Sequence, residues 1–258
     1  VNYNDTLGTT AIWDSIIYRN LCRKNQVPLA NQIPQSDYTI RGAKEEPSQQ
    51  IAGGYVKEVQ EGMHNWVLSF DLNSLYPSII IQNNMSPETL LPNMLNNHIS
   101  PDRILSGDIK VDSEACLCGN GSAFRKDKKG IIPEIVERLY ATRVEVKKQM
   151  LDEKRKLELV PQNEKKKYQQ IESNIARLET SQTAIKILLN SLYGAMANKY
   201  FKFYEPQIAE GVTLTGQTVI KRGEKAVNEY MQSIMEDDKD RVIAIDTDSL
   251  YITVDDII

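Results

Sequence analysis

The sequence has 258 residues, of which 41% are hydrophobic and 26% are charged, and its net charge is −4 at pH 7. This composition is ordinary for a soluble protein, and the length suffices to bury one large core or two modest ones. The sequence contains no run of eighteen apolar residues and opens with no signal-peptide pattern, so neither membrane insertion nor export is expected.

Few residues are available for chemistry through sulfur or imidazole. The three cysteines include a C-x-C pair, Cys116 and Cys118, but no second pair that would complete a zinc site. We therefore expect three free thiols in a reducing compartment. The two histidines, His64 and His98, leave little room for histidine-based catalysis.

Positive charge is concentrated in one segment. Residues 125–186 contain sixteen Lys and Arg against ten Asp and Glu, a local balance of +6, so the remainder of the chain carries −10. Segregated positive charge of this kind is what phosphate binding requires. The alternative is that many of these lysines only cover a solvated helix face.

The N-terminal region is polar, with one amphipathic segment. Residues 12–22 carry apolar side chains at 12, 13, 16, 17 and 21, which predicts a helix. A loop rich in Pro, Gln and Ser follows to about Gln50 and is suited to a boundary between domains.

A strand-to-helix turn with a carboxylate is predicted near residue 71. Residues 66–70 form an apolar, β-prone run that ends in Asp71, and Pro77 suits the first turn of a following helix. Residues 72–76 must then turn sharply and expose backbone amides, which attract anions next to a helix N-terminus. A carboxylate beside such an anion site indicates a divalent metal between carboxylate and phosphate. The alternative is a buried strand that ends in a turn aspartate.

Residues 85–130 are expected to be irregular. Turn signals occur at residues 86–87, 106–108 and 119–121, and the last of these lies between apolar segments, where it predicts the turn of a hairpin.

Two long helices are predicted next. Pro133 and Glu134 favour a helix start, and the helical pattern continues to about Leu159. Residues 160–163 break the pattern, and a second helical stretch runs from about Glu164 to Asn198, in one piece or two. A short connection makes the helices antiparallel neighbours, and they are too long and too charged to be a core pair. They should therefore form a projecting hairpin.

Each of these helices places polar side chains on one face. Arg143 and Lys147 are four residues apart, and Lys186, Asn190 and Tyr193 follow i, i+4, i+7 spacing. A stripe of Lys, Asn and Tyr among apolar neighbours is not a packing stripe. For the basic pair, a solvated helix face is an equally good interpretation.

The C-terminal part predicts a helix and a second carboxylate site. Residues 210–230 have helical periodicity, and the acidic residues 236–240 form an expected solvated turn. Two apolar runs then flank Asp246-Thr247-Asp248, which predicts a β-hairpin with both carboxylates at its tip. Paired acids on apolar strands indicate a bound cation, and two Mg²⁺ ions held by carboxylates are a recurrent device for phosphoryl transfer.

Three segments resemble the sequence motifs of family B DNA polymerases. Residues 71–80 (Asp-Leu-Asn-Ser-Leu-Tyr-Pro-Ser-Ile-Ile) resemble motif A, residues 186–194 resemble motif B, and residues 246–249 (Asp-Thr-Asp-Ser) resemble motif C. They occur in the family's order, which makes the resemblance specific. The residues of these motifs are most similar to those of the replicative polymerases of T-even-type bacteriophages.

The resemblance implies an α+β fold, with a palm subdomain of antiparallel β-sheet and packed helices plus a projecting antiparallel two-helix fingers hairpin. It assigns residues 1–45 to the remnant of the N-terminal, exonuclease side and its linker. Residues 46–131 would form the first part of the palm with motif A, residues 132–198 the fingers, and residues 199–258 the second, truncated part of the palm with motif C. Two positions depart from the family pattern. Ile51 stands where the linker motif before Gly53-Gly54 has a tyrosine, and Ile245 stands where motif C often has a glycine.

The resemblance also implies roles for individual residues. Asp71, Asp246 and Asp248 would be catalytic, and Asp71, Asp248 and the carbonyl of Leu72 would bind metal. The residues expected to bind the nucleotide are Ser74, Leu75, Tyr76, Arg143, Lys147, Lys186 and Asn190. Tyr193 and Gly194 would lie at the nascent base pair.

The implied activity is template-directed DNA synthesis, in which a dNTP transfers its nucleotidyl group to a primer 3′-hydroxyl with two Mg²⁺, for which Mn²⁺ can substitute. One metal would lower the pKa of the hydroxyl and the other would neutralise the departing pyrophosphate. Expected partners are primer-template DNA, the dNTP, the remainder of the polymerase with its exonuclease and thumb, and a sliding clamp bound through regions outside this sequence. No membrane is expected as a partner, and the expected location is the cytoplasm of a phage-infected bacterium.

The sequence stops ten residues after Asp248, before any thumb, so we expect a fragment or one piece of a split enzyme that is inactive alone. Two alternative classes of protein remain. A reverse transcriptase or RNA polymerase palm shares the paired acids but would not carry this motif B. A non-catalytic nucleic-acid-binding or assembly piece of a split polymerase would not need Asp71, Asp248 and Lys186 together.

Overall fold

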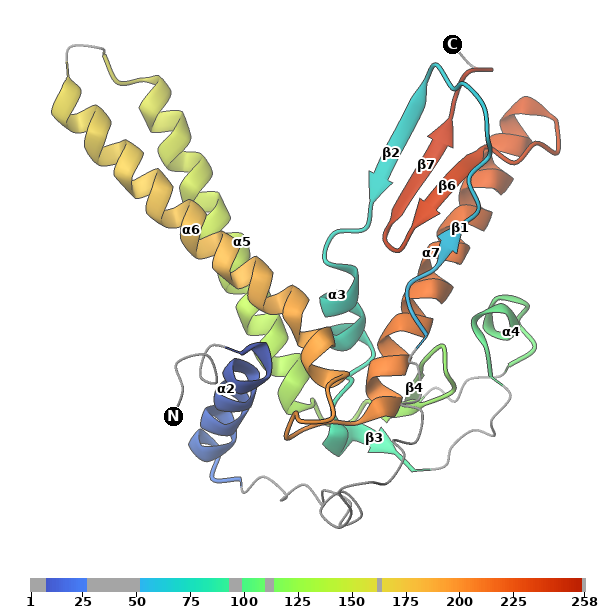
Figure 1. Cartoon of the computed structure of the whole chain (residues 1–258), viewed down its shortest axis with the longest axis horizontal. Helices are drawn as coiled ribbons and strands as arrows, with labels where there is room; N and C mark the ends of the chain where they lie inside the picture. Colours follow the sequence, from blue (N-terminus) through green and yellow to red (C-terminus); the bar gives the residue numbers. More distant parts are fainter. Residues whose placement is uncertain (1–7, 27–51, 93–98, 110–113, 162–163, 257–258) are drawn as a thin grey trace, which may run out of the picture.

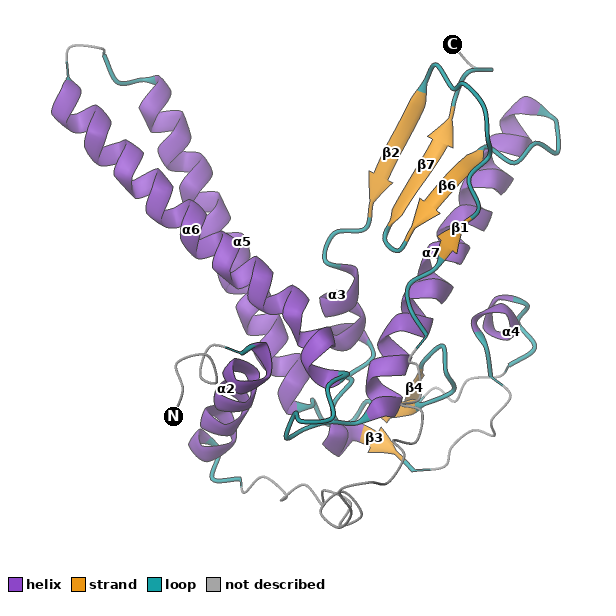
Figure 2. Cartoon of the chain, viewed as in Figure 1, coloured by secondary structure: helices purple, strands orange, loops and turns teal. Residues whose placement is uncertain are grey.

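The computed structural model of the chain describes residues 8–26, 52–92, 99–109, 114–161 and 164–256. Its helices and strands form an α+β protein with two antiparallel sheets (Figures 1 and 2). The Pro-, Gln- and Ser-rich loop predicted before Gln50, together with Ile51, lies outside the described residues.

The larger sheet contains the two carboxylate segments. Its strands are β1 (Val56–Lys57), β2 (Val67–Asp71), β6 (Val242–Asp246) and β7 (Ser249–Thr253), in the order β1-β6-β7-β2 with every pair antiparallel. The predicted strand and the predicted hairpin are therefore confirmed. The register places Asp71 opposite Ser249, so motif A and motif C meet at one end of the sheet.

The smaller sheet has the order β3-β5-β4 and is formed by β3 (Leu90–Leu91), β4 (Ala115–Leu117) and β5 (Ala123–Arg125). The predicted turn at residues 119–121 closes the β4–β5 hairpin, since the amide of Cys118 donates to the carbonyl of Ser122 at 2.8 Å. The region expected to be irregular also contains a 3₁₀ turn, η2 (Pro87–Thr89), and a short helix, α4 (Pro101–Leu105).

The two predicted long helices form an antiparallel hairpin that projects from the rest of the chain (Figure 1). They are α5 (Ile131–Glu158) and α6 (Lys165–Met196), with 28 and 32 residues. At 1.5 Å per residue they extend about 42 and 48 Å. The second helix, α6, is continuous, so the helical stretch predicted from about Glu164 to Asn198 forms one helix and not two.

A further long helix, α7 (Pro206–Met235), joins two hydrophobic clusters. Its first turns place Ile208 and Val212 in the main core, with α3 (Leu75–Gln82) and the bases of α5 and α6. Further along, Ile220 packs with Ile245 and other residues of β6 and β7 in a second, smaller cluster. Because α7 is buried in both clusters, it fixes the larger sheet relative to the base of the hairpin.

The N-terminal helix α2 (Thr9–Arg23) belongs to the main core and confirms the helix predicted at residues 12–22. Trp13 is fully buried, and its indole N–H lies 3.2 Å from both the carbonyl of Leu188 and the hydroxyl of Ser191 on α6. Arg138 on α5 donates to the side-chain oxygen of Asn20 at 2.8 Å. This helix therefore contacts both helices of the hairpin at their base.

Two features differ from the sequence-based expectations. The alternative of a buried strand before Asp71 is wrong, because β2 is an edge strand and Phe70 is 55% exposed. Residues 236–240 are not simply a solvated turn, because Asp237 pairs at 2.6 Å with Arg241, whose side chain is 1% exposed. The hydrogen bonds from Arg241 lower the pKa of Asp237 to about 2.

The three cysteines are free thiols, as predicted. Within the part of the chain that the structure describes, no helix is long and apolar enough to cross a membrane.

Replacing Trp13 with alanine should lower the free energy of unfolding by about 3–5 kcal/mol, because a fully buried indole and its bonds to α6 are lost. Tyr18→Ala on the same helix is the matched control, since Tyr18 is half exposed, and should change stability by less than about 0.5 kcal/mol. Urea unfolding followed by circular dichroism measures both. Equal losses in the two variants would contradict the packing described for α2.

Candidate active site

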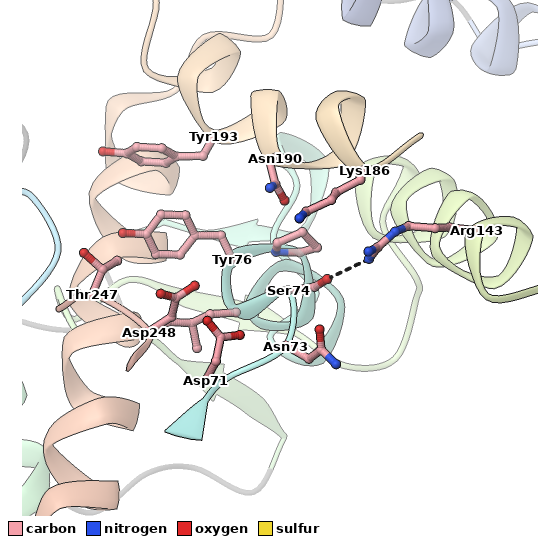
Figure 3. A pocket seen from close by; sticks show the side chains of 12 residues that line it. Asp71, Asn73, Ser74, Tyr76, Arg143, Lys186, Asn190, Tyr193, Thr247 and Asp248 are labelled. Atoms are coloured by element: carbon pink, nitrogen blue, oxygen red, sulfur yellow. Dashed lines mark hydrogen bonds between the residues drawn. The ribbon is translucent and has the colours of Figure 1, made fainter. Parts of the chain in front are cut away.

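A cavity of about 410 Å³ lies where β2, α3 and the tip of the β6–β7 hairpin face α5 and α6 (Figure 3). Most of the residues predicted to act on metal or nucleotide line it: Asp71, Ser74, Leu75, Tyr76, Arg143, Lys186, Asn190, Tyr193 and Asp248. These residues come from the three motifs and, through Arg143, from α5, so the fold brings four segments that are far apart in the sequence together.

The carboxylate side of the cavity is built by the strand register. Asp71 ends β2, and Asp248 lies in the turn just before β7. The amide of Leu72 donates to the carbonyl of Asp248 at 2.8 Å, and the hydroxyl of Ser249 lies 3.4 Å from the Asp71 carboxylate. Figure 3 shows the two carboxylates next to each other. Their spacing is therefore held by backbone pairing rather than by flexible side chains.

The tip of the β6–β7 hairpin is a tight turn. Thr247 has a positive φ of 55°, and its amide donates to the carbonyl of Tyr55 at 2.9 Å. Its hydroxyl donates to the carboxylate of Asp246 at 3.0 Å. Asp246 is exposed and does not line the cavity, whereas Thr247 and Asp248 do.

Negative charge gathers at the tip of the β6–β7 hairpin. Burial raises the pKa of the Asp248 carboxyl, and the negative charges of Asp71 and then Asp246 raise it further. Over the described ranges, no lysine or arginine forms an ion pair with any of the three carboxylates. Adjacent carboxylates that lack such partners are suited to a divalent cation.

The donor set fits magnesium in part. Mg²⁺ is usually held by one or two carboxylates together with phosphate oxygens of the substrate. Asp71 and Asp248 can supply the carboxylates. In the described part of the chain, no group of three or more His, Cys, Asp and Glu side chains is arranged to hold a metal. The remaining ligands would therefore have to come from backbone, water or substrate.

The opposite side of the cavity carries positive charge from the hairpin. Lys186 and Asn190 reach in from α6, and Arg143 reaches in from α5 (Figure 3). A guanidinium nitrogen of Arg143 lies 3.4 Å from the hydroxyl of Ser74. Its Nε is buried and has no hydrogen-bond partner among the described residues. Lys147 lines an adjoining cavity of about 480 Å³, which shares Asn73 and Arg143 with the first.

The turn before α3 has the conformation expected of an anion site. Ser74 is the N-cap residue in the left-handed region, with φ 53° and ψ 48°. The first amides of a helix have no partner within the helix and carry the positive end of its dipole. At α3 these are the amides of Leu75 and Tyr76, because Pro77 has no N–H. Leu75, Tyr76 and Pro77 all line the cavity.

Two tyrosines pack together at the edge of the cavity. The rings of Tyr76 and Tyr193 lie 5.1 Å apart at an interplanar angle of 49°. Burial raises the pKa of the Tyr76 phenol, and Tyr193 and Asp248 raise it further. The phenol therefore remains protonated at neutral pH.

Four predicted residues do not line the main cavity: Leu72, Lys147, Gly194 and Asp246. At Gly194 an added Cβ would meet no atom of the described chain within 4 Å, so the backbone there faces open space. Sequence reasoning missed Asn73, Pro77 and Thr247 as lining residues. Asn73 and Pro77 lie within motif A and Thr247 lies within motif C, so the motifs already contained the signal that could have found them.

The fold and the paired carboxylates agree with a nucleotide-polymerising enzyme, and sequence comparison specifies which kind. The sequence profile of DNA polymerase family B matches residues 11–257, so the chain belongs to this family. This confirms the family that the three motifs indicated.

The relatives include phage and archaeal enzymes. The DNA-directed DNA polymerases of Enterobacteria phage T4 and Escherichia phage RB69 are 29% and 30% identical over 99% and 95% of this chain, but over 31% and 30% of their own lengths. A DNA polymerase of Pyrococcus glycovorans is 34% identical over 79% of this chain and 21% of that protein. The phage matches agree with the resemblance to T-even-type polymerases. The chain spans less than a third of the length of these curated relatives.

Proposed function

We propose that this chain forms the central catalytic part of a family B DNA polymerase, which extends a primer 3′ end with dNTPs under the direction of a template. The observation that carries this proposal is the cavity itself, in which the carboxylates of Asp71 and Asp248 face Lys186 and Arg143. A triphosphate is the substrate that such opposed charges suit, because its anionic chain can contact the cations while a bound metal links it to the carboxylates.

The proposed organisation follows the arrangement of the elements. Residues 46–131 and 199–258 would form the palm, and residues 132–198 the fingers. Residues 1–45 would lead from the exonuclease side. Primer-template DNA and dNTP are the proposed substrates, and the other parts of the polymerase are the proposed partners, with a sliding clamp bound through them.

In the reaction, the primer 3′-oxygen attacks the α-phosphorus of the dNTP, the bond to the β-phosphate breaks, and pyrophosphate leaves with the electron pair. Two Mg²⁺ ions, held by Asp71, Asp248 and the carbonyl of Leu72, would activate the hydroxyl and neutralise the leaving group when bound. The chain's own contribution is to fix these oxygen ligands through the β2–β7 register. Asp246, on the same tip, would add negative potential without lining the cavity.

The hairpin and α3 would orient the triphosphate. Lys186 and Arg143 would contact phosphate oxygens, and Asn190 would donate a hydrogen bond from the same face of α6. The backbone amides of Ser74 and Leu75 would approach the phosphates at the start of α3. Lys147, in the adjoining cavity, would attract the triphosphate before or after the reaction. Such positioning supplies much of the rate of phosphoryl transfer.

The tyrosines would define the nucleoside side of the cavity. Tyr76 would form the floor beneath the incoming sugar, where a 2′-hydroxyl would clash with its ring. Tyr193 and Gly194 would lie near the nascent base pair, and the open space at Gly194 leaves room for it.

Asp71→Asn and Asp248→Asn should each lower nucleotide addition by several orders of magnitude in the complete polymerase, while primer-template binding persists. The reason is that each variant removes a charged metal ligand but no group proposed to contact DNA. Single-turnover primer extension and a DNA-binding titration measure the two properties.

Neither variant should be less stable than the wild type in the absence of divalent cations, because each removes one of two adjacent negative charges. Thermal unfolding with chelator tests this control. Retention of a tenth of the normal activity by either variant would contradict the assigned ligands and favour a non-catalytic, nucleic-acid-binding role.

Lys186→Ala should lower kcat/KM for the dNTP far more than Lys165→Ala does. Both lysines belong to α6 and are exposed, but Lys186 lines the cavity while Lys165 begins the helix at the distal end of the hairpin. Loss of one phosphate contact should cost about tenfold to a hundredfold. Comparable losses in both variants would show that the face of Lys186, Asn190 and Tyr193 has no special role.

Tyr76→Ala should raise the use of ribonucleotides relative to deoxyribonucleotides while deoxynucleotide addition stays measurable, because it removes the ring that the 2′-hydroxyl would meet. The ratio of kcat/KM for dNTP and for rNTP in wild type and variant measures this. A tyrosine with only a packing role would lower both alike, and an unchanged ratio would refute the proposed sugar gate.

A further inference from the structure

A glycine of α7 lies directly against the proposed sugar gate. Gly216 is buried, and a Cβ built there would lie 3.2 Å from Cε1 of Tyr76. The same Cβ would lie at an ordinary contact distance of 3.6 Å from the side chains of Leu75 and Ile79. The missing side chain therefore lets α7 approach α3 at the position where the Tyr76 ring is held.

The ring of Tyr76 is thus bounded by two helices. Tyr193 of α6 contacts the ring at a centroid distance of 5.1 Å. Gly216 of α7 lies against another part of the ring, near Cε1 of Tyr76. Tyr76 is itself only half-buried and borders the cavity. The Tyr76 ring is therefore packed against Tyr193 and Gly216, and the open cavity is the side toward which the ring can be displaced.

An added methyl group at residue 216 must displace something by a few tenths of an ångström, since 3.2 Å is shorter than an ordinary contact. The helix α7 cannot move easily, because Val212 and Ile220 on either side of this position are fully buried in the two hydrophobic clusters. The Tyr76 ring can move toward the cavity. The expected result is a narrower space between the Tyr76 ring and the proposed position of the incoming sugar.

We propose that Gly216 is a specificity-determining position, which sets how far the Tyr76 ring extends into the sugar site. This inference rests on the proposed role of Tyr76 as a sugar gate. Gly216 contacts no substrate itself and acts through the position of the ring. A ribonucleotide, with its larger sugar, should lose more from the narrowing than a deoxyribonucleotide.

The test compares the ratio of kcat/KM for dNTP over rNTP in the complete polymerase for wild type and Gly216→Ala. Since a displacement of about 1 Å can cost about a hundredfold in rate, a few tenths of an ångström should raise the ratio roughly threefold or more. Gly211→Ala is the matched control. It lies on the same helix, is buried, and would place its Cβ 3.2 Å from the side-chain oxygen of Asn120, away from the cavity.

A double-mutant cycle with Tyr76→Ala separates this inference from the gate itself. The effect of Gly216→Ala on the ratio should vanish when the ring is absent, and Gly211→Ala should leave the ratio unchanged in both backgrounds. If Tyr76→Ala lowers the dNTP/rNTP ratio but Gly216→Ala does not alter it, the inference about Gly216 is wrong and the proposed role of Tyr76 stands. If Tyr76→Ala leaves the ratio unchanged, the gate itself fails and the inference fails with it.

Two further outcomes are decisive. An effect of Gly216→Ala that persists without the ring, or that Gly211→Ala reproduces, would overturn the inference. Should Gly216→Ala unfold the protein, thermal unfolding of Gly216→Ala combined with Tyr76→Val provides the answer. Restored stability would locate the clash at the ring, and continued instability would place it elsewhere and overturn the inference.

Discussion

The close approach of two like charges, Asp71 and Asp248, is the constraint on which the rest of the site depends. Carboxylates repel each other, and burial of Asp248 adds to the cost. They are held in place by the backbone: the register pairs Asp71 with Ser249, and the amide of Leu72 bonds the carbonyl of Asp248. The end of a sheet can hold such a pair because the backbone hydrogen bonds between its strands do not depend on which side chains the strands carry.

The second requirement is that cations and carboxylates face each other across the cavity without neutralising each other. Lys186 and Arg143 belong to the hairpin, whereas the acids belong to the sheet, and α7 fixes the distance between these units because it is buried in both clusters. The same helix passes close behind Tyr76 at Gly216. One helix therefore sets both the separation of the charges and the position of the tyrosine ring.

Local patterns predicted most of the elements, and long-range contacts account for what they missed. The helix start near Pro133, the helix predicted at residues 210–230 and the turn at Asp246–Asp248 follow from favourable first-turn residues, periodicity and turn residues, which are encoded within a few positions. The exposure of Phe70 depends on β2 being an edge strand, which is a property of strand order. Arg241 is buried between a local partner, Asp237, and Asp256, which lies fifteen residues further along the chain and approaches it only in the folded protein.

The placement of the cations near the base of the hairpin limits how its motion can affect the site. Lys186 precedes the end of α6 at Met196 by ten residues, a distance of about 15 Å along the axis. A rotation of about 10° at the base would therefore move its backbone by about 3 Å, the length of one hydrogen bond. Trp13 bonds this same stretch of α6, and α2 also contacts α5 through Asn20 and Arg138. Any rotation that carries the cations toward or away from the carboxylates must consequently move α2 with the hairpin or break the bonds of Trp13.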